Sequence, residues 1–350
     1  MKKKIAILGS TGSIGKCLID IIKRDKKNFE IVLLTSNKNY KDLLKQAKFF
    51  KVKNLIITNQ NSYKKVKENR FYENMNIYND FNSFRKIFKK KIDYTMSSIS
   101  GIQGLKPTIE IIKYTKKIAI ANKEAIICGW DLIEKKLNKY KTEFIPVDSE
   151  HFSIWSLVKD YNYKFIDKIY ITASGGPFLR KNKKQIDKTN VKEALKHPNW
   201  KMGEKISIDS ATMMNKIFEV IEAIKIFSIN CKQIDILIHP KSYIHAIINF
   251  KNGLIKLLAH DTTMEVPISN ALYRNETLHN FKNYDFNYKN LNGINFIKPD
   301  LKKFPLLQIL KYKFNNTYLE IILVSLNDAL VKKYLNGEIP YILIHRSIIK

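Results

Sequence analysis

Three carboxylates in the middle of the chain have the chemistry and spacing of a metal site. Asp148 and Glu150 lie two residues apart in the motif PVDSEH at 146–151, and Glu219 follows the motif ISIDSATMMNK at 206–216. The run FIPV before the first acid predicts a strand, along which alternation directs the first two side chains to the same side. Oxygen ligands suit Mg²⁺ or Mn²⁺ better than zinc. The alternative for any single acid is a solvated surface carboxylate.

Serine, asparagine and lysine side chains near these acids have the chemistry of a phosphate site. Ser174 precedes two glycines in SGGPF at 174–178, which expose backbone N–H groups. Ser210 lies where a helix is predicted to begin, and Asn215 and Lys216 follow on the helix face that carries the third acid. The sequence therefore predicts a divalent cation and a phosphorylated substrate held side by side.

A candidate lid lies between these groups, in the motif HPNWKMG at 197–203. Trp200 and Met202 stand on a stretch that runs from Gly175 to Gly203 and mixes glycine, lysine and polar residues. This composition favours a segment that closes over substrate and excludes water. The alternative is a tryptophan buried in the core.

A glycine-rich turn near the N-terminus indicates a dinucleotide site. Gly9, Gly12 and Gly15 follow the predicted strand IAIL and precede an amphipathic helix. Glycine permits a tight turn and a close backbone approach, and the helix N-terminus offers N–H groups to a pyrophosphate. The spacing GxxGxxG differs from the commoner GxGxxG. The alternative is an ordinary strand-to-helix turn.

The end of the second predicted strand, LLTSNKNY at 33–40, discriminates between the nicotinamide cofactors. An NAD site usually has an acid there to accept hydrogen bonds from the ribose hydroxyls. This chain has no acid at that place and has Lys38 between Asn37 and Asn39. A cation favours the 2′-phosphate, so NADPH is the predicted cofactor.

The arrangement of apolar runs predicts an α/β fold with a Rossmann-like NADPH-binding domain, an α/β catalytic domain and a shortened C-terminal helical domain. Short β-branched runs alternate with helical stretches in the first half, which is typical of a parallel sheet. Residues 168–173 and 234–250 are strand-like, and the apolar stripe from 306 onward has helical spacing. The predicted divisions are 1–147 for cofactor, 148–274 for catalysis and dimerisation, 275–305 for a linker and 306–350 for the helical tail.

The net charge of +30 raises the question of a nucleic-acid partner. Only six of the 62 basic residues are arginine, and the lysines are spread along the chain. This pattern favours solvated lysine faces, and we expect no nucleic-acid partner. No apolar run is long enough for a membrane span, so we expect no membrane partner. Three distant cysteines and no targeting segment predict a cytoplasmic location.

These motifs together resemble one family, the 1-deoxy-D-xylulose 5-phosphate reductoisomerases, which commit carbon to the methylerythritol phosphate route to isoprenoids. The resemblance covers about the first 270 residues in order, with thinner similarity beyond. Besides the central block, it rests on GSTGSIG at 9–15, GLKPT at 104–108, ANKE at 121–124 and IHPKSYIH at 238–245.

The resemblance implies a role for each matching residue. The metal ligands would be Asp148, Glu150 and Glu219. The substrate contacts would be Lys123, Ser149, Ser174, His197, Ser210, Asn215 and Lys216, of which Ser174 and the last three would hold the phosphate, with Trp200 as the lid residue. The NADPH contacts would be Thr11, Gly12, Ser13, Ile14, Asn37, Lys38, Asn39, Asn122, Glu124 and Gly203.

The implied reaction is the isomerisation of 1-deoxy-D-xylulose 5-phosphate to a branched aldehyde, by cleavage and rejoining or by a direct shift, and reduction to 2-C-methyl-D-erythritol 4-phosphate. The implied cofactors are NADPH and Mg²⁺ or Mn²⁺, with Co²⁺ as an alternative metal, and the implied assembly is a homodimer. Alternative functions are an NADPH-dependent reductase of another sugar phosphate, or a non-catalytic basic protein that binds polyanions.

The chain departs from the family pattern beside the predicted phosphate lysine. The family usually has Gly-Leu where this chain has Ile217 and Phe218. A branched residue next to Lys216 is expected to crowd the phosphate site. Where the family has an Asn-Glu pair in the tail helix, this chain has Asn327 and Asp328. The helical tail is expected to be reduced.

Overall fold

The structure is a computed structural model that describes residues 1–350 apart from 70–71, 201, 274–286, 313 and 315–316. The described residues form two compact units. The first contains Met1–Asp148 and the residues from Met264 to Tyr273, and the second contains Ser149–Thr263 and the residues from Asn287 onward.

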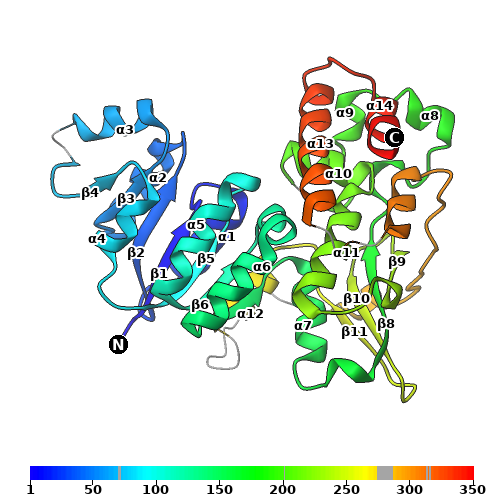
Figure 1. The fold of residues 1–350 in the computed structure, drawn as a ribbon, viewed down its shortest axis with the longest axis horizontal. Coiled ribbons are helices and arrows are strands. Elements are labelled where there is room, and N and C mark those ends of the chain that lie inside the picture. Colours follow the sequence, from blue (N-terminus) through cyan, green and yellow to red (C-terminus); the bar gives the residue numbers. More distant parts are fainter. Residues whose placement is uncertain (70–71, 201, 274–286, 313, 315–316) are drawn as a thin grey trace. The chain divides into compact units, whose positions relative to one another are not determined.

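The first unit is built on a parallel sheet of seven strands in the order β4-β3-β2-β1-β5-β6-β7 (Figure 1). In β1, Ile5, Ala6, Ile7 and Leu8 are all fully buried. Strands covered on both faces are continuous apolar runs of this kind. The strands are β1 (Lys3–Leu8), β2 (Phe29–Ser36), β3 (Asn54–Ile57), β4 (Asn76–Tyr78), β5 (Ile92–Ser97), β6 (Thr115–Ile120) and β7 (Glu143–Pro146).

Helices connect these strands in the βαβ manner. They are α1 (Ser13–Arg24), α2 (Tyr40–Phe50), α3 (Gln60–Lys67), α4 (Phe84–Ile87), α5 (Leu105–Ile111) and α6 (Lys123–Tyr140), joined by the distant α12 (Glu265–Tyr273). The Tyr273 hydroxyl donates to Asp25 at 2.9 Å, and Glu265 pairs with Arg24 of α1. These contacts explain why α12, whose residues fall in the predicted catalytic range, belongs to the first unit.

The second unit is built on a mixed sheet of four strands in the order β11-β10-β8-β9. The strands are β8 (Ile166–Ala173), β9 (Ile234–Ile238), β10 (Ile244–Phe250) and β11 (Ile255–Ala259). Strand β10 is antiparallel to both β8 and β11, whereas β8 and β9 are parallel.

The helices of the second unit include the C-terminal pair. They are α7 (Ser149–Val158), α8 (Lys183–Asp187), α9 (Val191–Ala194), α10 (Glu204–Ala211), α11 (Met214–Phe227), α13 (Thr317–Leu335) and α14 (Tyr341–Ile349). The last two share a core with α10 and with Phe178 of the SGGPF segment. The C-terminal helices therefore pack on the segments that carry the predicted phosphate residues.

The predicted alternation of strands and helices in the first half agrees with the sheet, and the fold class is confirmed. The short strands β4, β5 and β11 and the helix α14 had not been predicted. Residues 274–286 of the predicted linker lie outside the described residues, while Ile297 forms a bridge with Ile238 of β9. The assignment of separate roles to the four predicted ranges stays a prediction.

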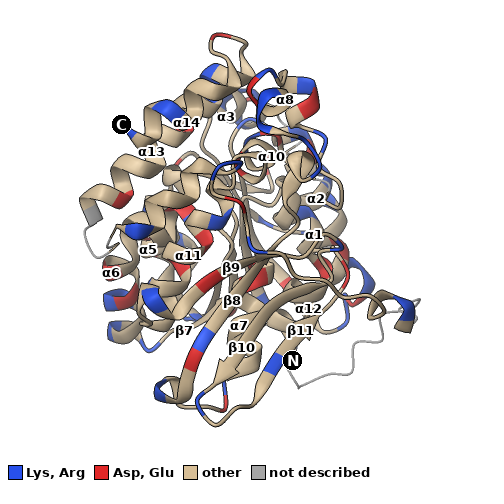
Figure 2. Cartoon of the chain, turned by 90° about the vertical axis from the view of Figure 1, so that its right-hand side faces the viewer, with Lys and Arg blue, Asp and Glu red and all other residues tan. Residues whose placement is uncertain are grey.

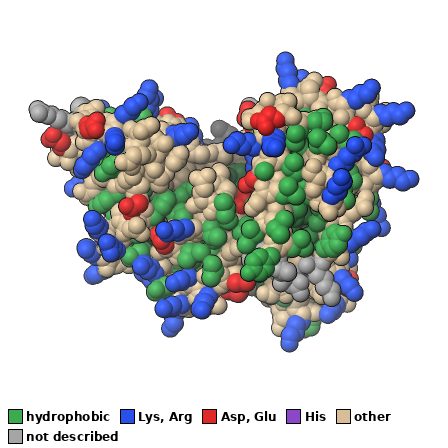
Figure 3. All heavy atoms as spheres, turned by 45° about the horizontal axis from the view of Figure 1, so that its top comes forward, with side chains coloured by type: hydrophobic (Ala, Val, Ile, Leu, Met, Phe, Trp, Pro, Cys, Tyr) green, Lys and Arg blue, Asp and Glu red, His purple; other side chains and the backbone are tan. Residues whose placement is uncertain are grey.

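Basic residues are dispersed over the surface. Figure 2 shows them on helices and strands alike, with acidic positions between them. In Figure 3 the lysine and arginine side chains of the drawn face stand among apolar and neutral ones. Among the described residues, no helix combines the length and apolar character needed to cross a bilayer.

Candidate functional site

The glycine turn joins β1 to α1, as the sequence predicts. Gly9 has φ +82°, and a Cβ atom there would lie 2.8 Å from the Ser98 carbonyl oxygen. A Cβ atom on Gly15 would lie 2.4 Å from the Gly9 carbonyl oxygen, so only glycine fits. Gly12 is the N-cap of α1, and no side chain caps the helix there. The first N–H groups of α1 are therefore suited to an anion.

The predicted cofactor residues in the turn, Thr11, Ser13 and Ile14, flank this helix start. After β2, Asn37, Lys38 and Asn39 are all exposed. Asn39 accepts from the Asp42 N–H at 3.2 Å and so caps α2. This part of the first unit presents a lysine and amides, and no acid, at the end of the second strand.

The start of α6 carries three further predicted residues. Asn122 caps the helix by accepting from the Ala125 N–H at 2.8 Å, and its amide donates to the carbonyl oxygens of Ile99 and Gly101. The Lys123 ammonium lies 3.0 Å from the Asp148 carboxylate, and both side chains are largely buried. Glu124, the residue after Lys123, is buried as well. The motif ANKE thus fixes one loop and directs one lysine toward a predicted metal ligand.

The predicted metal ligands do not lie as strand alternation suggested. Strand β7 ends at Pro146, and Glu150 lies in the first turn of α7. Asp148 precedes that helix and is bonded to its first residue. Within the second unit, the carboxylates of Glu150 and Glu219 lie on the same ammonium, that of Lys216. The strand argument was wrong, because the chain turns from strand to helix here, so that Asp148 precedes α7 and Glu150 lies in it.

Helix α11 carries the third acid together with two phosphate candidates. Asn215 donates to one Glu219 oxygen, and the Lys216 ammonium contacts the other. The same ammonium lies 2.8 Å from Glu150 and also donates to the Thr172 carbonyl oxygen. Burial opposes the charged form of Lys216, but the carboxylates of Glu150 and Glu219 outweigh it and raise its pKa. Lys216 is therefore the cation that Glu150 and Glu219 share.

Ser174 is arranged to donate a hydrogen bond. Its Oγ accepts from the Gly176 N–H at 2.9 Å and lies 3.0 Å from His197 Nε2. His197 Nδ1 accepts from the Trp200 N–H at 2.9 Å, so the proton of the neutral ring is on Nε2. Burial, with the charge of Lys216 second, lowers the pKa of His197 to about 4. With two donors on its oxygen, the Ser174 hydroxyl can donate its own proton only to a third group, which must be an acceptor.

Ser210 lies at the end of a helix and not at its start. It is the second-last residue of α10, and α11 begins at Met214 after a break at Met213, whose φ is +66°. The prediction of one helix beginning near Ser210 was wrong, because the left-handed Met213 separates two helices. The Gly176 backbone packs closely against Ser210, since a Cβ atom on Gly176 would lie 3.1 Å from the Ser210 carbonyl oxygen.

The predicted lid residue Trp200 is half-buried. Its ring meets His245 edge to face, with centroids 6.0 Å apart. Asn199 anchors the segment by donating to the Pro240 carbonyl oxygen and to Ser242 Oγ, both at 2.7 Å. Gly203, a predicted cofactor contact, is the exposed N-cap of α10.

Sequence reasoning missed a buried pair behind the acids. His151 Nε2 lies 2.9 Å from the Glu219 carbonyl oxygen, and Nδ1 lies 3.5 Å from Glu222. Both side chains are almost completely buried. The pair ties α7 to α11 and so fixes the helices that carry two of the acids. The signal was present, since Glu222 follows Glu219 by three residues on one helix face.

The two units define a class of protein: a nucleotide-binding α/β domain joined to an α/β unit with an acidic, lysine-containing cluster, as in a metal-dependent oxidoreductase. Comparison with known proteins is specific. Three family models match. The model described as 1-deoxy-D-xylulose 5-phosphate reductoisomerase matches residues 5–129, and the model of the 1-deoxy-D-xylulose 5-phosphate reductoisomerase C-terminal domain matches 144–227. A third model, described as the DXP reductoisomerase C-terminal domain, matches 260–350. The chain belongs to the 1-deoxy-D-xylulose 5-phosphate reductoisomerase family.

Relatives and solved structures of this family match this chain over nearly its whole length. The reductoisomerase of Pelagibacter ubique is 57% identical over 99% of this chain and 90% of its own length. That of Sulfurihydrogenibium sp. is 37% identical with the same coverage. The Zymomonas mobilis enzyme in complex with NADPH has a TM-score of 0.88 at 30% identity and covers 100% of this chain and 91% of that one. A reductoisomerase in complex with NADPH, fosmidomycin and magnesium has a TM-score of 0.90 at 32% identity, covering 99% and 88%.

Proposed function

We propose that this chain converts 1-deoxy-D-xylulose 5-phosphate to 2-C-methyl-D-erythritol 4-phosphate with NADPH and a divalent cation, in isoprenoid precursor biosynthesis. The observation that carries the proposal is the pair of carboxylates, Glu150 and Glu219, on the Lys216 ammonium, with Asp148 directly before α7, in a chain of this family. When bound, NADPH supplies a hydride and the cation supplies Lewis acidity.

The residues present fit both cofactors. The metal would be held by Asp148, Glu150 and Glu219, because three carboxylates, two of them on the same buried ammonium, form an all-oxygen donor set suited to Mg²⁺ or Mn²⁺. The pyrophosphate of NADPH would lie at the start of α1, where no side chain caps the helix at Gly12 and where Gly9 and Gly15 let the turn pack closely on its own backbone. Lys38 would contact the 2′-phosphate.

The substrate phosphate would be held by Ser174, Ser210, Asn215 and Lys216. The support for Ser174 is its hydrogen bonding, since Gly176 and neutral His197 donate to its oxygen and leave its proton for an external acceptor. Lys123 and Ser149 would contact the sugar near the metal, and Trp200 would cover it and exclude water.

The test is the oxidation of NADPH by purified protein with 1-deoxy-D-xylulose 5-phosphate and Mg²⁺ or Mn²⁺, followed by absorbance. We expect turnover that stops when the metal is chelated and returns when it is restored. Glu219→Gln should abolish turnover and leave the NADPH dissociation constant within about twofold, because this acid acts on the metal. Turnover that is indifferent to chelation would refute the proposal.

We also propose a homodimer formed through β11. This strand lies at the edge of its sheet, and its exposed residues include Ile255 at 62% and Leu257 at 46%. An apolar edge strand favours pairing with a second copy. Light scattering should give twice the chain mass for the wild type and the monomer mass for Leu257→Lys. Ile322→Lys, at an exposed site on α13, is the control that should stay dimeric.

A cytoplasmic location is proposed on the chemistry of the three cysteines, none of which forms a disulfide. Reduced cysteines of this kind are typical of a reducing compartment. Fractionation of cells that make the tagged protein should recover it with cytoplasmic markers.

A further inference from the structure

Helix α13 presents three polar side chains toward the interior of the second unit. Glu320, Asn327 and Tyr334 are spaced by seven residues and so lie on one face of the helix. Their exposed fractions are 0%, 0% and 2%. Buried polar groups are costly unless they are paired, so each of the three is expected to have a specific partner.

Each side chain contacts a different segment of the unit. Glu320 pairs with Lys225 of α11 at 2.6 Å. The Asn327 amide donates to Asp209 of α10 at 2.8 Å. The Tyr334 hydroxyl donates at 3.2 Å to a carbonyl oxygen between α8 and α9. The middle contact reaches the residue next to Ser210.

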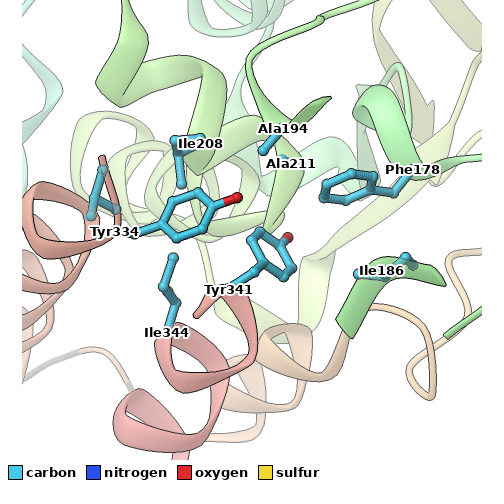
Figure 4. Close-up of a cluster of buried hydrophobic side chains, with 9 residues drawn as sticks. Phe178, Ile186, Ala194, Ile208, Ala211, Tyr334, Tyr341 and Ile344 are labelled. Atoms are coloured by element: carbon cyan, nitrogen blue, oxygen red, sulfur yellow. The ribbon is translucent and has the colours of Figure 1, made fainter. Parts of the chain in front are cut away.

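An apolar core lies beside this ladder of contacts. Figure 4 shows Tyr334 and Tyr341 of the C-terminal helices facing Ile208 and Ala211 of α10 and Phe178 of the SGGPF segment. Ser210 therefore stands on a helix end that is held by apolar packing from α13 and α14 and by one directional polar contact from Asn327.

The Asp209 carboxylate needs that contact for a physical reason. It is only 2% exposed and lies in the last turn of α10, where the helix dipole disfavours negative charge. Its oxygens accept from Asn327 at 2.8 Å and from Lys205 at 3.1 Å, and Lys205 is shared with Asp328 at 2.9 Å. Loss of the Asn327 donor takes a short, directional hydrogen bond from a buried carboxylate and shifts the balance of its contacts toward Lys205.

A movement of Asp209 would be transmitted to the phosphate residues. Ser210 is the next residue, and the Gly176 backbone packs against its carbonyl group. We propose that Asn327 is a positioning residue for substrate phosphate, acting through Asp209 to fix Ser210. The inference rests on the phosphate role proposed above for Ser210.

The experiment compares Asn327→Asp with the wild-type enzyme, loaded with NADPH and Mg²⁺. A carboxylate at 327 faces Asp209 and repels it, so the Asp209 end of α10 is displaced. We expect the KM for the sugar phosphate and the Ki of inorganic phosphate as a competitor to rise about tenfold, with the KM for NADPH unchanged. Asn327→Ser, which is too short to reach Asp209, is a milder second variant if the first does not fold.

The reciprocal swap tests the pairing itself. Asn327→Asp combined with Asp209→Asn keeps one donor and one acceptor at the same net charge. The swap should restore the Ki of inorganic phosphate to within about threefold of the wild type. The remaining loss of binding free energy is then well below that expected for Asn327→Asp alone. A swap no better than Asn327→Asp alone overturns the proposed pairing.

Tyr334→Phe is the matched control, since it removes another buried hydrogen bond from the same helix face. It should lower the Tm and leave the Ki of inorganic phosphate unchanged. If the Asn327 variants lower the Tm but not phosphate affinity, the residue is only structural. If Ser210→Ala raises the Ki and Asn327→Asp does not, the positioning role alone fails. If Ser210→Ala leaves the Ki unchanged, the phosphate assignment fails, and the positioning route fails with it.

Discussion

The Lys216 ammonium lies 2.8 Å from the Glu150 carboxylate, which joins a predicted phosphate residue directly to a predicted metal ligand. Glu219 contacts the same ammonium at 2.5 Å. A divalent cation held by these carboxylates would neutralise their negative charge in place of the Lys216 ammonium. Lys216 would then be released toward a phosphate, so the metal and phosphate sites are electrostatically coupled.

This coupling predicts that Lys216→Met binds metal more tightly. Removal of a unit charge close to both carboxylates removes the cation that competes with Mn²⁺, and at an effective dielectric near 20 the interaction is worth on the order of a few kcal/mol. We expect the Mn²⁺ dissociation constant, measured by electron paramagnetic resonance, to fall at least about tenfold. Phosphate affinity should fall in the same variant.

Lys225→Met is the control for this prediction. Lys225 lies on the same helix, six residues after Glu219, and its ion pair is with buried Glu320 of α13 and not with the acids of the site. Its loss should lower the Tm without a change in Mn²⁺ affinity. Weaker Mn²⁺ binding by Lys216→Met would show that the lysine orders the acids and does not compete with the metal.

Gly15→Ala should destabilise the nucleotide-binding unit. The new Cβ atom would lie 2.4 Å from the Gly9 carbonyl oxygen, a backbone atom that cannot rotate away. Overpacking of this kind costs about 1–3 kcal/mol. Gly12→Ala is the comparison, because its Cβ atom would meet the nearest atom at 3.5 Å. Urea unfolding of the protein without cofactor should show a loss for the first variant alone, and equal losses would contradict the steric account.

Much of the site follows from residue types at local spacing. Asn215, Lys216 and Glu219 were expected on one helix face because helical periodicity is local, and they do lie together on α11. The break between α10 and α11 could not be predicted, since nothing in the letters Thr-Met-Met requires Met213 to adopt a positive φ. The turn that places Glu150 on a helix was missed for a similar reason, because it depends on where β7 stops pairing.

The substitution of Ile217 and Phe218 for Gly-Leu also shows what needs three dimensions. Both side chains are fully buried. Lys216 still reaches Glu150 and Glu219, so the branched residue does not displace the lysine from the acidic cluster. Asn327 could not be linked to Asp209 from the sequence, since their contact spans 118 residues and depends on the packing of α13.

Lys38→Ala should weaken NADPH more than NADH. Lys38 is exposed after β2 in a position without an acidic neighbour at the strand end. Loss of a charge-assisted contact to the 2′-phosphate costs about 1.5–3 kcal/mol, which corresponds to roughly tenfold or more in NADPH affinity. Lys41→Ala, at an exposed site on α2, should alter neither affinity. Equal losses for NADPH and NADH would remove Lys38 from the 2′-phosphate site.

The His245 and His260 rings predict how stability depends on pH. They stack with centroids 3.7 Å apart, and both are almost fully buried. Burial, with the neighbouring His245 second, lowers the pKa of His260 to about 3 from 6.5. Between these values the unfolded chain binds a proton at this position that the folded chain does not. The free energy of unfolding therefore falls as the pH falls from about 6.5, with a contribution near 1.4 kcal/mol per pH unit from this one group.

His260→Phe keeps a ring in the stack and removes the titration. Its free energy of unfolding should be lower at pH 7, because His260 Nδ1 hydrogen-bonds the Asp261 carbonyl oxygen at 2.7 Å. Between pH 6 and pH 4 its slope should be shallower than that of the wild type by about 1.4 kcal/mol per pH unit. Tyr334→Phe loses a buried hydrogen bond but no histidine, so urea titrations should show a constant offset from the wild type across that range. Parallel slopes for His260→Phe and the wild type would mean that the His260 ring takes up its proton equally in the folded and unfolded chain, against the effect of its burial.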